Sequence, residues 1–157
     1  MLSKKSKYAI KALIALAKNK NNVPVIISKI SQAEKIPKKF LETILLGLKN
    51  QGILGSKKGL GGGYFLLKSP SKIMLSDVIR STDGPIALIP CVSMNFYQRC
   101  EECADEVTCG LRDVAKQVRD ASLNILSHTS IADLVNRENK LQKSKAHPIK
   151  TGLRKFI

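Results

Sequence analysis

Four cysteines gathered in one segment are the residues of this sequence best suited to chemistry. The chain has no other cysteine, and the four are Cys91, Cys100, Cys103 and Cys109. Clustered thiolates are soft ligands that suit zinc or an iron–sulfur centre. Structural zinc sites more often show two Cys-x-x-Cys pairs, and here only Cys100 and Cys103 form one. A Cys-x-x-Cys thiol can also have a lowered pKa, which leaves a thiol–disulfide switch open, although Glu101 and Glu102 would repel a thiolate.

A glycine-rich loop behind two lysines is the second candidate. Residues 55–67 read GSKKGLGGGYFLL, with Lys57 and Lys58 ahead of the glycines. A dinucleotide fingerprint starting at Gly59 would need glycine where Tyr64 stands and a helix afterwards, and the chain has no Gly-Lys-Ser/Thr of a P-loop. Glycines permit positive φ and close backbone approach. The loop is therefore predicted to bring its lysines to DNA phosphates, which give affinity and salt dependence rather than sequence choice.

Polar side chains at the start of residues 37–51 are the third candidate. A buried helical stripe is predicted from the apolar residues Phe40, Leu41, Ile44, Leu45 and Leu48. Lys38, Lys39, Glu42 and Thr43 then point away from the core. Lysine can contact phosphates or guanine, glutamate can accept from a cytosine amino group, and threonine can touch a base edge. The alternative is an ordinary solvated helix face.

The elements that must position these groups follow from the hydrophobic pattern. A helix is predicted over 7–18, and Ser28 is a good N-cap for a short second helix. Pro37 suits the first position of a third helix, and 53–57 and 63–67 read as the strands of a β-hairpin. The fold class is thus mainly α-helical with a small β-hairpin, in the order of a winged helix-turn-helix. In that fold the third helix enters the major groove and the hairpin reaches the backbone or minor groove.

Charge is divided unevenly along the 157 residues, whose formal net charge is +15. Residues 1–68 hold fourteen lysines and two acidic residues, 69–135 are mildly acidic, and 136–157 are strongly basic. This division indicates one module that binds a polyanion and another with a different role. A lysine-rich surface without that role is the alternative. No secretory signal or membrane-spanning run is visible, so no membrane contact and a cytoplasmic protein are expected.

The second half is predicted to hold a sensor segment and a long helix. Ser76 is expected to cap a short helix, and 86–109 to be irregular. Within 110–127 the spacing of a coiled-coil seam is kept by Leu111, Val114, Val118, Ala121 and Ile125. This face either packs on its own domain or forms a dimer seam. A final helical turn is expected to end at Val135, before a mobile tail that adds electrostatic grip on DNA.

Several motifs together are similar to those of a known family. They are Lys7-Tyr-Ala9, Pro37-Lys-Lys-Phe-Leu-Glu42, Leu48-Lys-Asn-Gln-Gly-Ile-Leu54, Gly59-Leu-Gly-Gly-Gly-Tyr64, Asp77-Val-Ile-Arg80 and Asp83-Gly-Pro85, followed by the cysteines. Over about residues 1–135 the sequence resembles the Rrf2 family of bacterial winged-helix regulators, which includes sensors of iron–sulfur status and of nitric oxide.

The resemblance implies a homodimer on a near-palindromic, double-stranded DNA operator, with the helix 110–127 crossing its partner. It also implies a [2Fe–2S] or [4Fe–4S] cluster on the cysteines, whose state alters DNA affinity. Together with the fold, it marks as DNA-binding candidates Lys7, Ser28, Lys38, Lys39, Phe40, Glu42, Thr43, Lys57, Lys58, Gly59 and Gly61.

By position, Cys91, Cys103 and Cys109 match the family's cysteine ligands, and Cys100 is an addition. Some members use a histidine three residues after the last cysteine, where this chain has Arg112, and others use an aspartate where it has Lys7. Neither residue can serve normally, so Cys100 is the natural fourth ligand of an all-cysteine site. Alternatively Cys100 resolves an oxidised Cys103, since some members carry no cluster and respond through thiols or partner proteins.

The sequence is therefore interpreted as a dimeric DNA-binding transcriptional regulator, expected to be a repressor. The expected divisions are a winged helix-turn-helix domain (1–68), a connector and sensor segment (69–109), a dimerisation helix (110–135) and a basic tail (136–157). The alternative is the same regulator without a cluster, switching by thiol oxidation or zinc. A redox enzyme or a zinc-binding structural protein is the rival of another class. No nucleophile–histidine–acid arrangement can be placed, so no catalytic residue is predicted.

Overall fold

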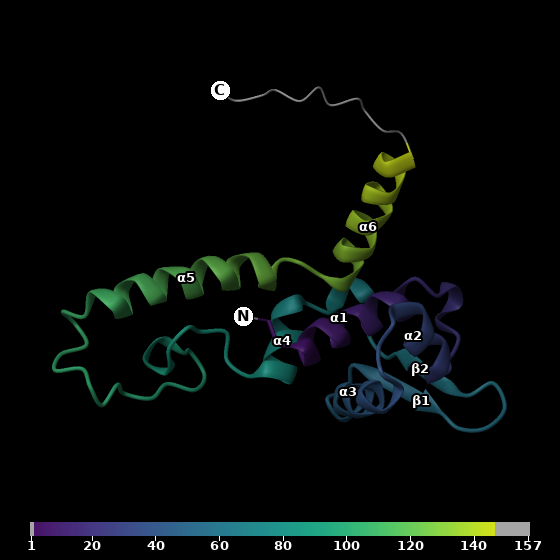
Figure 1. The fold of residues 1–157 in the computed structure, drawn as a ribbon, viewed down its shortest axis with the longest axis horizontal. Helices are drawn as coiled ribbons and strands as arrows, with labels where there is room; N and C mark the ends of the chain where they lie inside the picture. Colours follow the sequence, from purple (N-terminus) through teal and green to yellow (C-terminus); the bar gives the residue numbers. More distant parts are fainter. Residues whose placement is uncertain (1, 147–157) are drawn as a thin grey trace.

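The computed structural model describes residues 2–146, and they form a mainly helical fold with one two-stranded hairpin. The elements are α1 (Lys4–Ala17), α2 (Ile27–Glu34), α3 (Lys38–Asn50), β1 (Leu54–Lys57), β2 (Gly63–Leu66), α4 (Leu75–Asp83), α5 (Gly110–Ser127) and α6 (Ile131–Ala146). Figure 1 shows a body made of α1–α4 and the hairpin, from which α5 extends as an arm and α6 projects separately. The predicted fold class is confirmed. None of the helices described is both long and apolar enough to span a membrane.

One hydrophobic core surrounds α1, which packs against α2, α3, α4, α6 and β2. From α3 this core receives the buried side chains of Leu41, Ile44, Leu45 and Leu48. Burying one such side chain contributes about 1.5–3 kcal/mol. This stripe therefore fixes the rotation of α3 about its axis and turns its polar face outward.

The base of the hairpin is fastened to the chain just before α2. Val25 and Tyr64 exchange two backbone hydrogen bonds of 2.8 and 2.9 Å. Gly63, beside this junction, has a φ of +148°, and a Cβ there would lie 2.3 Å from the Val25 carbonyl oxygen. Only glycine combines this backbone conformation with such close approach. Gly63 thus allows β2 to meet the segment that leads into α2.

Two predicted helix starts are wrong. Ser28 lies inside α2, whose N-cap is Ile26, and Ser76 lies inside α4, whose N-cap is Met74. Neither helix has a side-chain hydrogen bond at its N-cap. Their starts are set instead by apolar burial, since Ile30 is only 2% exposed in the core. Tertiary packing has overridden a capping preference worth about 1 kcal/mol.

The final helix is much longer than the turn predicted to end at Val135. Residues 136–146 continue α6, and 147–157, the rest of the predicted tail, lie outside the described residues. Ser130 starts this helix with a reciprocal cap, because the Asp133 N–H donates to its hydroxyl and its own N–H donates to the Asp133 carboxylate. Ile131 is fully buried in the core of the body. The predicted dimerisation segment is therefore two helices, and the second begins in that core.

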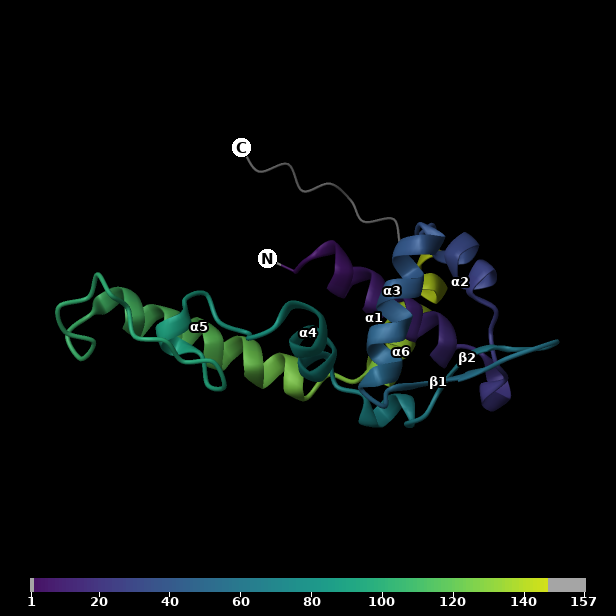
Figure 2. The ribbon, with the colours of Figure 1, turned by 90° about the horizontal axis from the view of Figure 1, so that it is seen from below.

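The arm has a small core of its own, separate from the body. Cys91, Val92 and Ala115 are buried together, with Ala87 and Ile89 packed against them. Figure 2 shows the segment before α5 running back along this helix. The predicted helix over 110–127 is confirmed, and the 86–109 segment is largely irregular apart from a 3₁₀ turn at Pro90–Val92.

Candidate DNA interface and cysteine segment

The polar face of α3 is exposed along its first turns. The side chains that form it are Lys38, Lys39, Glu42 and Thr43. Pro37 precedes the helix and supplies no side-chain cap. The first N–H groups of α3 therefore lack a side-chain acceptor, and helix N-termini of this kind favour anions such as phosphate. This face therefore presents two lysine ammonium groups, a glutamate carboxylate and a threonine hydroxyl at the N-terminal end of α3, beside those N–H groups.

Phe40 lies at the edge of this face rather than in the buried stripe predicted for it. Phe40 is 37% exposed, and its ring packs edge-to-face against the ring of Tyr8 on α1, with the two ring centroids 5.7 Å apart. Such an aromatic pair contributes about 0.5–1.5 kcal/mol beyond burial. The contact ties α1 to the first turn of α3, so Phe40 helps to position the adjacent lysines.

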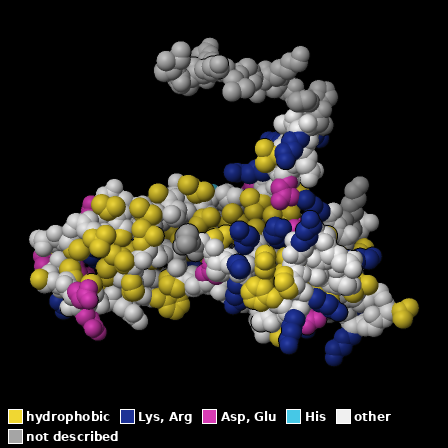
Figure 3. All heavy atoms as spheres, in the orientation of Figure 1, with side chains coloured by type: hydrophobic (Ala, Val, Ile, Leu, Met, Phe, Trp, Pro, Cys, Tyr) yellow, Lys and Arg dark blue, Asp and Glu magenta, His cyan; other side chains and the backbone are white. Residues whose placement is uncertain are grey.

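Cations dominate the surface of the body. Figure 3 shows Lys and Arg side chains gathered over the end of the molecule that holds α1, α3 and the hairpin. Lys7 is exposed on α1, whereas Ser28 is half-buried in α2. Of the two acidic residues in 1–68, Glu34 pairs with Lys11 at 3.3 Å. Glu42 is then the acidic side chain left on this basic surface, where it faces outward from α3.

The loop between β1 and β2 has a defined shape. Gly59 and Gly61 have positive φ values of 89° and 73°, and the Gly62 N–H donates to the Gly59 carbonyl at 2.9 Å. Lys57 ends β1 and Lys58 follows it, and both are exposed. The predicted wing is thus present, with its lysines at the base of the turn. Leu60, which sequence reasoning passed over, stands at the tip, and its position between glycines was the available signal.

The four cysteines do not converge in this conformation. Cys91 is buried in the small core of the arm, Cys100 is exposed, and Cys103 and Cys109 are half-buried. All four are free thiols. In residues 2–146 no three His, Cys, Asp or Glu side chains are gathered closely enough to hold a metal ion. The donor types suit a soft metal or an iron–sulfur cluster, but binding one through Cys91 would require the segment to rearrange.

Cys103 and Cys109 are the pair that the segment brings into contact. Partial burial of its thiol, followed by a hydrogen bond with Cys109, raises the pKa of Cys103. The Cys103 thiol also donates to the Asp105 carbonyl at 3.2 Å. A raised pKa lowers the thiolate fraction at neutral pH, and the thiolate is the reactive form. In this conformation the Cys103 thiol is therefore not activated.

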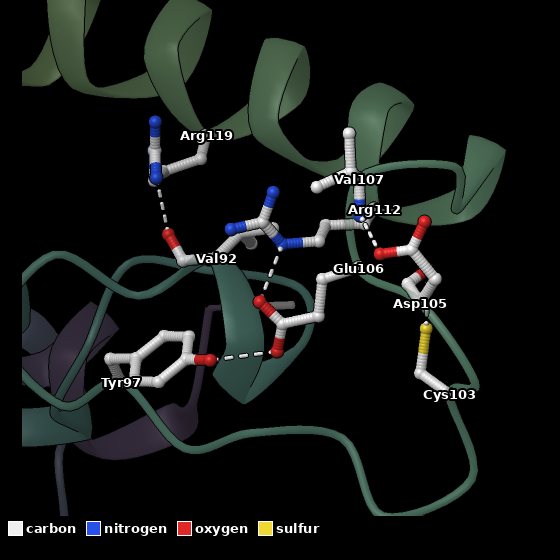
Figure 4. Close-up of polar contacts among 8 residues, drawn as sticks. All are labelled: Val92, Tyr97, Cys103, Asp105, Glu106, Val107, Arg112 and Arg119. Atoms are coloured by element: carbon white, nitrogen blue, oxygen red, sulfur yellow. Dashed lines mark hydrogen bonds and ion pairs between the residues drawn. The ribbon is translucent and has the colours of Figure 1, made fainter.

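A polar triad closes the loop that carries these cysteines (Figure 4). The Tyr97 hydroxyl donates to Glu106 at 2.7 Å, and the other carboxylate oxygen lies 3.5 Å from Nε of Arg112. The second contact is ionic, because Arg112 Nε is buried without a well-formed hydrogen bond. Arg112 occupies the position where some relatives were expected to carry a histidine ligand. Here its guanidinium holds the loop against the first turn of α5.

A second arginine attaches the 3₁₀ turn at Pro90–Val92, here named the Cys91 turn, to α5. The Arg119 side chain is only 12% exposed, and it donates to the carbonyl oxygen of Val92 while also pairing with Asp120 at 2.6 Å. Figure 4 shows this side chain reaching from α5 to the Cys91 segment. A change in position of Cys91 would therefore pull directly on the middle of α5.

The predicted seam on α5 is exposed. Val118 is 41% exposed and Leu111 69% exposed, with intermediate values for the other large residues of the seam, Val114 and Ile125. Ala121 is exposed as well. Figure 3 shows apolar side chains gathered over α5 and the segment before it. Among the described residues 2–146, this face does not pack on its own domain, which was one of the two alternatives left by the periodicity. A contiguous apolar strip of this kind marks an interaction surface.

Comparison with known proteins gives a consistent result. A family model described as "Rrf2: Iron-dependent Transcriptional regulator" matches residues 2–137. An Rrf2-like HTH-type transcriptional regulator of Rhodobacter capsulatus is 38% identical over 146 residues, covering 91% of this chain and 97% of that protein. The HTH-type transcriptional regulator IscR of Erwinia tasmaniensis is 29% identical over 140 residues, covering 89% of this chain and 81% of that protein. The structure of CymR, the global cysteine regulator of Bacillus subtilis, is similar with a TM-score of 0.73 and 28% identity, covering 87% of this chain and 97% of that one.

Proposed function

The chain belongs to the Rrf2 family of transcriptional regulators, and from this premise we propose that it represses transcription as a homodimer bound to a near-palindromic operator. The family and the relatives are regulators rather than enzymes. The single observation that carries the proposal is the exposed polar face at the N-terminal end of α3, held beside a lysine-flanked wing. Lys38, Lys39, Glu42 and Thr43 would meet the major groove, and Lys57 and Lys58 the adjacent phosphates.

The α3 lysines provide the direct test. Replacing Lys38 and Lys39 together by alanine should weaken operator binding and reduce the slope of log K against log salt by about 0.9 for each phosphate that is no longer neutralised. Gel shifts over a salt series on a fragment of the gene's own promoter measure both quantities. The matched control is Arg99→Ala with Lys116→Ala, which removes the same charge from exposed positions of the arm, away from α3 (Figure 1). Equal salt slopes for the two double variants would contradict the assignment of α3.

Dimerisation in this proposal uses the exposed seam of α5. Two copies that pair through this strip would bury apolar side chains that one chain leaves in water. A two-fold pair also presents two α3 helices to the two halves of a near-palindromic site. The same arrangement gives the arm its role, because the cysteine segment lies against the helix that would hold the dimer together.

Regulation in this proposal depends on the cysteine segment. Cys91, Cys103 and Cys109, with Cys100 as the fourth ligand, would hold an iron–sulfur cluster, which would supply a charge and oxidation state that respond to iron, oxygen or nitric oxide. Support comes from the four thiols and from the family description as iron-dependent. Arg119 joins the Cys91 turn to α5, so the position of this turn can influence the dimer helix. Switching by zinc or by thiol oxidation is the second candidate, favoured by the contact between Cys103 and Cys109.

Anaerobic reconstitution with iron and sulfide distinguishes these candidates. A brown protein with visible absorption, iron and sulfide is expected from the wild-type chain. Cys100→Ser should shorten the lifetime of the cluster if Cys100 is the fourth ligand. A colourless protein that takes up one zinc ion, or none, would contradict the cluster while leaving DNA binding untouched.

A further inference from the structure

Leu60 is the most exposed large apolar residue of the chain described. Its relative exposure is 107%, the value of a side chain with no protein neighbour. Single exposed leucines are common on protein surfaces and need no explanation of their own. This one differs because it occupies the tip of a hairpin that is built to project.

The turn holds this leucine outward rather than letting it fold back. Gly59 and Gly61, on either side of it, adopt positive φ. A Cβ on Gly62 would lie 2.5 Å from the Lys57 carbonyl oxygen, so the chain turns too tightly there for any other residue. The hydrogen bond from the Gly62 N–H to the Gly59 carbonyl closes the turn at 2.9 Å. The backbone conformation that presents the leucine is therefore encoded by its glycine neighbours.

The surroundings of the tip restrict what it can touch. Lys57 and Lys58 stand at its base, and no acidic residue occurs between Glu42 and Asp77. An apolar tip with two lysines beneath it is complementary to a polyanion whose charges lie outside and whose interior is apolar. Duplex DNA has this organisation, with phosphates outside and stacked bases inside. One leucine contributes about 1.5–3 kcal/mol on burial, too little to anchor a protein to a lipid surface by itself.

We propose that Leu60 is an apolar wedge that enters the minor groove beside the site of α3 and partly unstacks one base step. Architectural proteins insert leucine, isoleucine or proline in this way and bend the duplex by about 20–90°. The inference rests on the proposed function, because it needs an operator on which α3 is already placed. Unstacking is easiest at TA and CA/TG steps, so the wing selects sequence through deformability as well as contacting phosphates. This extends the sequence-based interpretation, which gave the wing phosphate contacts alone.

The test uses the full chain and a promoter fragment with 2-aminopurine placed in turn through the flank outside each α3 half-site. Binding of the wild-type protein should raise the fluorescence at one position, and circularly permuted fragments should show a bend centred there. Leu60→Ala should abolish the fluorescence rise, reduce the bend and weaken binding roughly tenfold, as expected for truncating an apolar side chain that is buried on binding. Leu60→Phe should retain all three effects. Changing the step to a stiff AA should weaken wild-type binding but leave Leu60→Ala nearly unaffected.

Two controls separate the wedge from the rest of the wing. Leu67→Ala makes the same deletion at an exposed leucine at the base of the hairpin, 56% exposed, and should change neither fluorescence nor affinity. Lys58→Ala should lower the salt slope by about one while keeping the fluorescence rise. If the wild-type protein shows no sequence-dependent binding, the proposed function fails. If it binds but no position brightens, or Leu60→Ala matches the wild type, the wedge alone is overturned.

Discussion

Replacing Val114 and Val118 by glutamate should convert the protein to a monomer and lower its operator affinity by at least about a hundredfold. Both side chains lie in the exposed seam of α5, where Val114 is 57% exposed and Val118 41% exposed. Two carboxylates from each copy would meet across a paired seam, and both desolvation and repulsion oppose that arrangement. A monomer also lacks the advantage of binding two half-sites at once, which is worth about 10²–10⁴ in avidity.

The control for this variant lies on the same helix. Lys116→Glu changes the net charge by the same amount at an exposed position outside the seam. It should remain dimeric, with at most a modest loss of affinity from its charge. Sedimentation velocity measures the oligomeric state, and gel shifts on full and half operators measure binding. A double variant that sediments as a dimer, or a wild type that sediments as a monomer, would show that α5 is not the dimer seam.

Gly63→Ala should lower the free energy of unfolding by about 2–4 kcal/mol, the range expected for a strained backbone combined with a core-type clash. The added Cβ would lie 2.3 Å from the Val25 carbonyl oxygen and 2.4 Å from its carbonyl carbon. These are backbone atoms, so they cannot rotate away as a flexible side chain would. The clash can be relieved only by breaking the two hydrogen bonds between Val25 and Tyr64, which fasten the wing to the segment before α2.

Gly47→Ala is the matched comparison, since it makes the same change in the middle of α3. A Cβ at Gly47 meets nothing within 4 Å, so this variant should gain about 0.5–1 kcal/mol from helix propensity. For a chain of this size, 1 kcal/mol shifts the melting temperature by about 2–4 °C. Thermal unfolding by circular dichroism should therefore place Gly63→Ala roughly 10 °C below the wild type and Gly47→Ala slightly above it. A melting temperature for Gly63→Ala equal to that of the wild type would contradict the role given to this junction.

The order of helices and strands in the body could be predicted because each element carries a local signal. The stripe of α3 repeats at helical spacing, and the glycines between two short apolar runs predict a hairpin. The family motifs lie on these same elements, and the comparisons confirm the family. The exposed positions of Lys38, Lys39, Glu42 and Thr43 follow from the same periodicity, because burial of one helix face exposes the other.

Predictions failed where a weak local preference competed with packing. Ser28 and Ser76 are good caps, but the buried Ile30 and Val78 of their helices fix where each helix begins. The sequence pattern did not predict the full length of α6, because the C-terminal half of this helix is mostly polar and lacks a hydrophobic periodicity. Phe40 was placed in the core by its apolar character, yet its ring extends past the stripe to meet Tyr8.

By itself the sequence determined the winged helix-turn-helix order, the basic charge of its DNA-binding candidates and the grouping of four thiols in one segment. Only the tertiary structure decided that the α5 seam stays exposed, and that Cys91 is buried in the small core of the arm while Cys103 and Cys109 are half-buried. The physical reason is the sequence separation over which each kind of interaction acts. Periodicity and turn chemistry act between residues a few positions apart, whereas these two outcomes depend on contacts, or their absence, between segments distant in the chain.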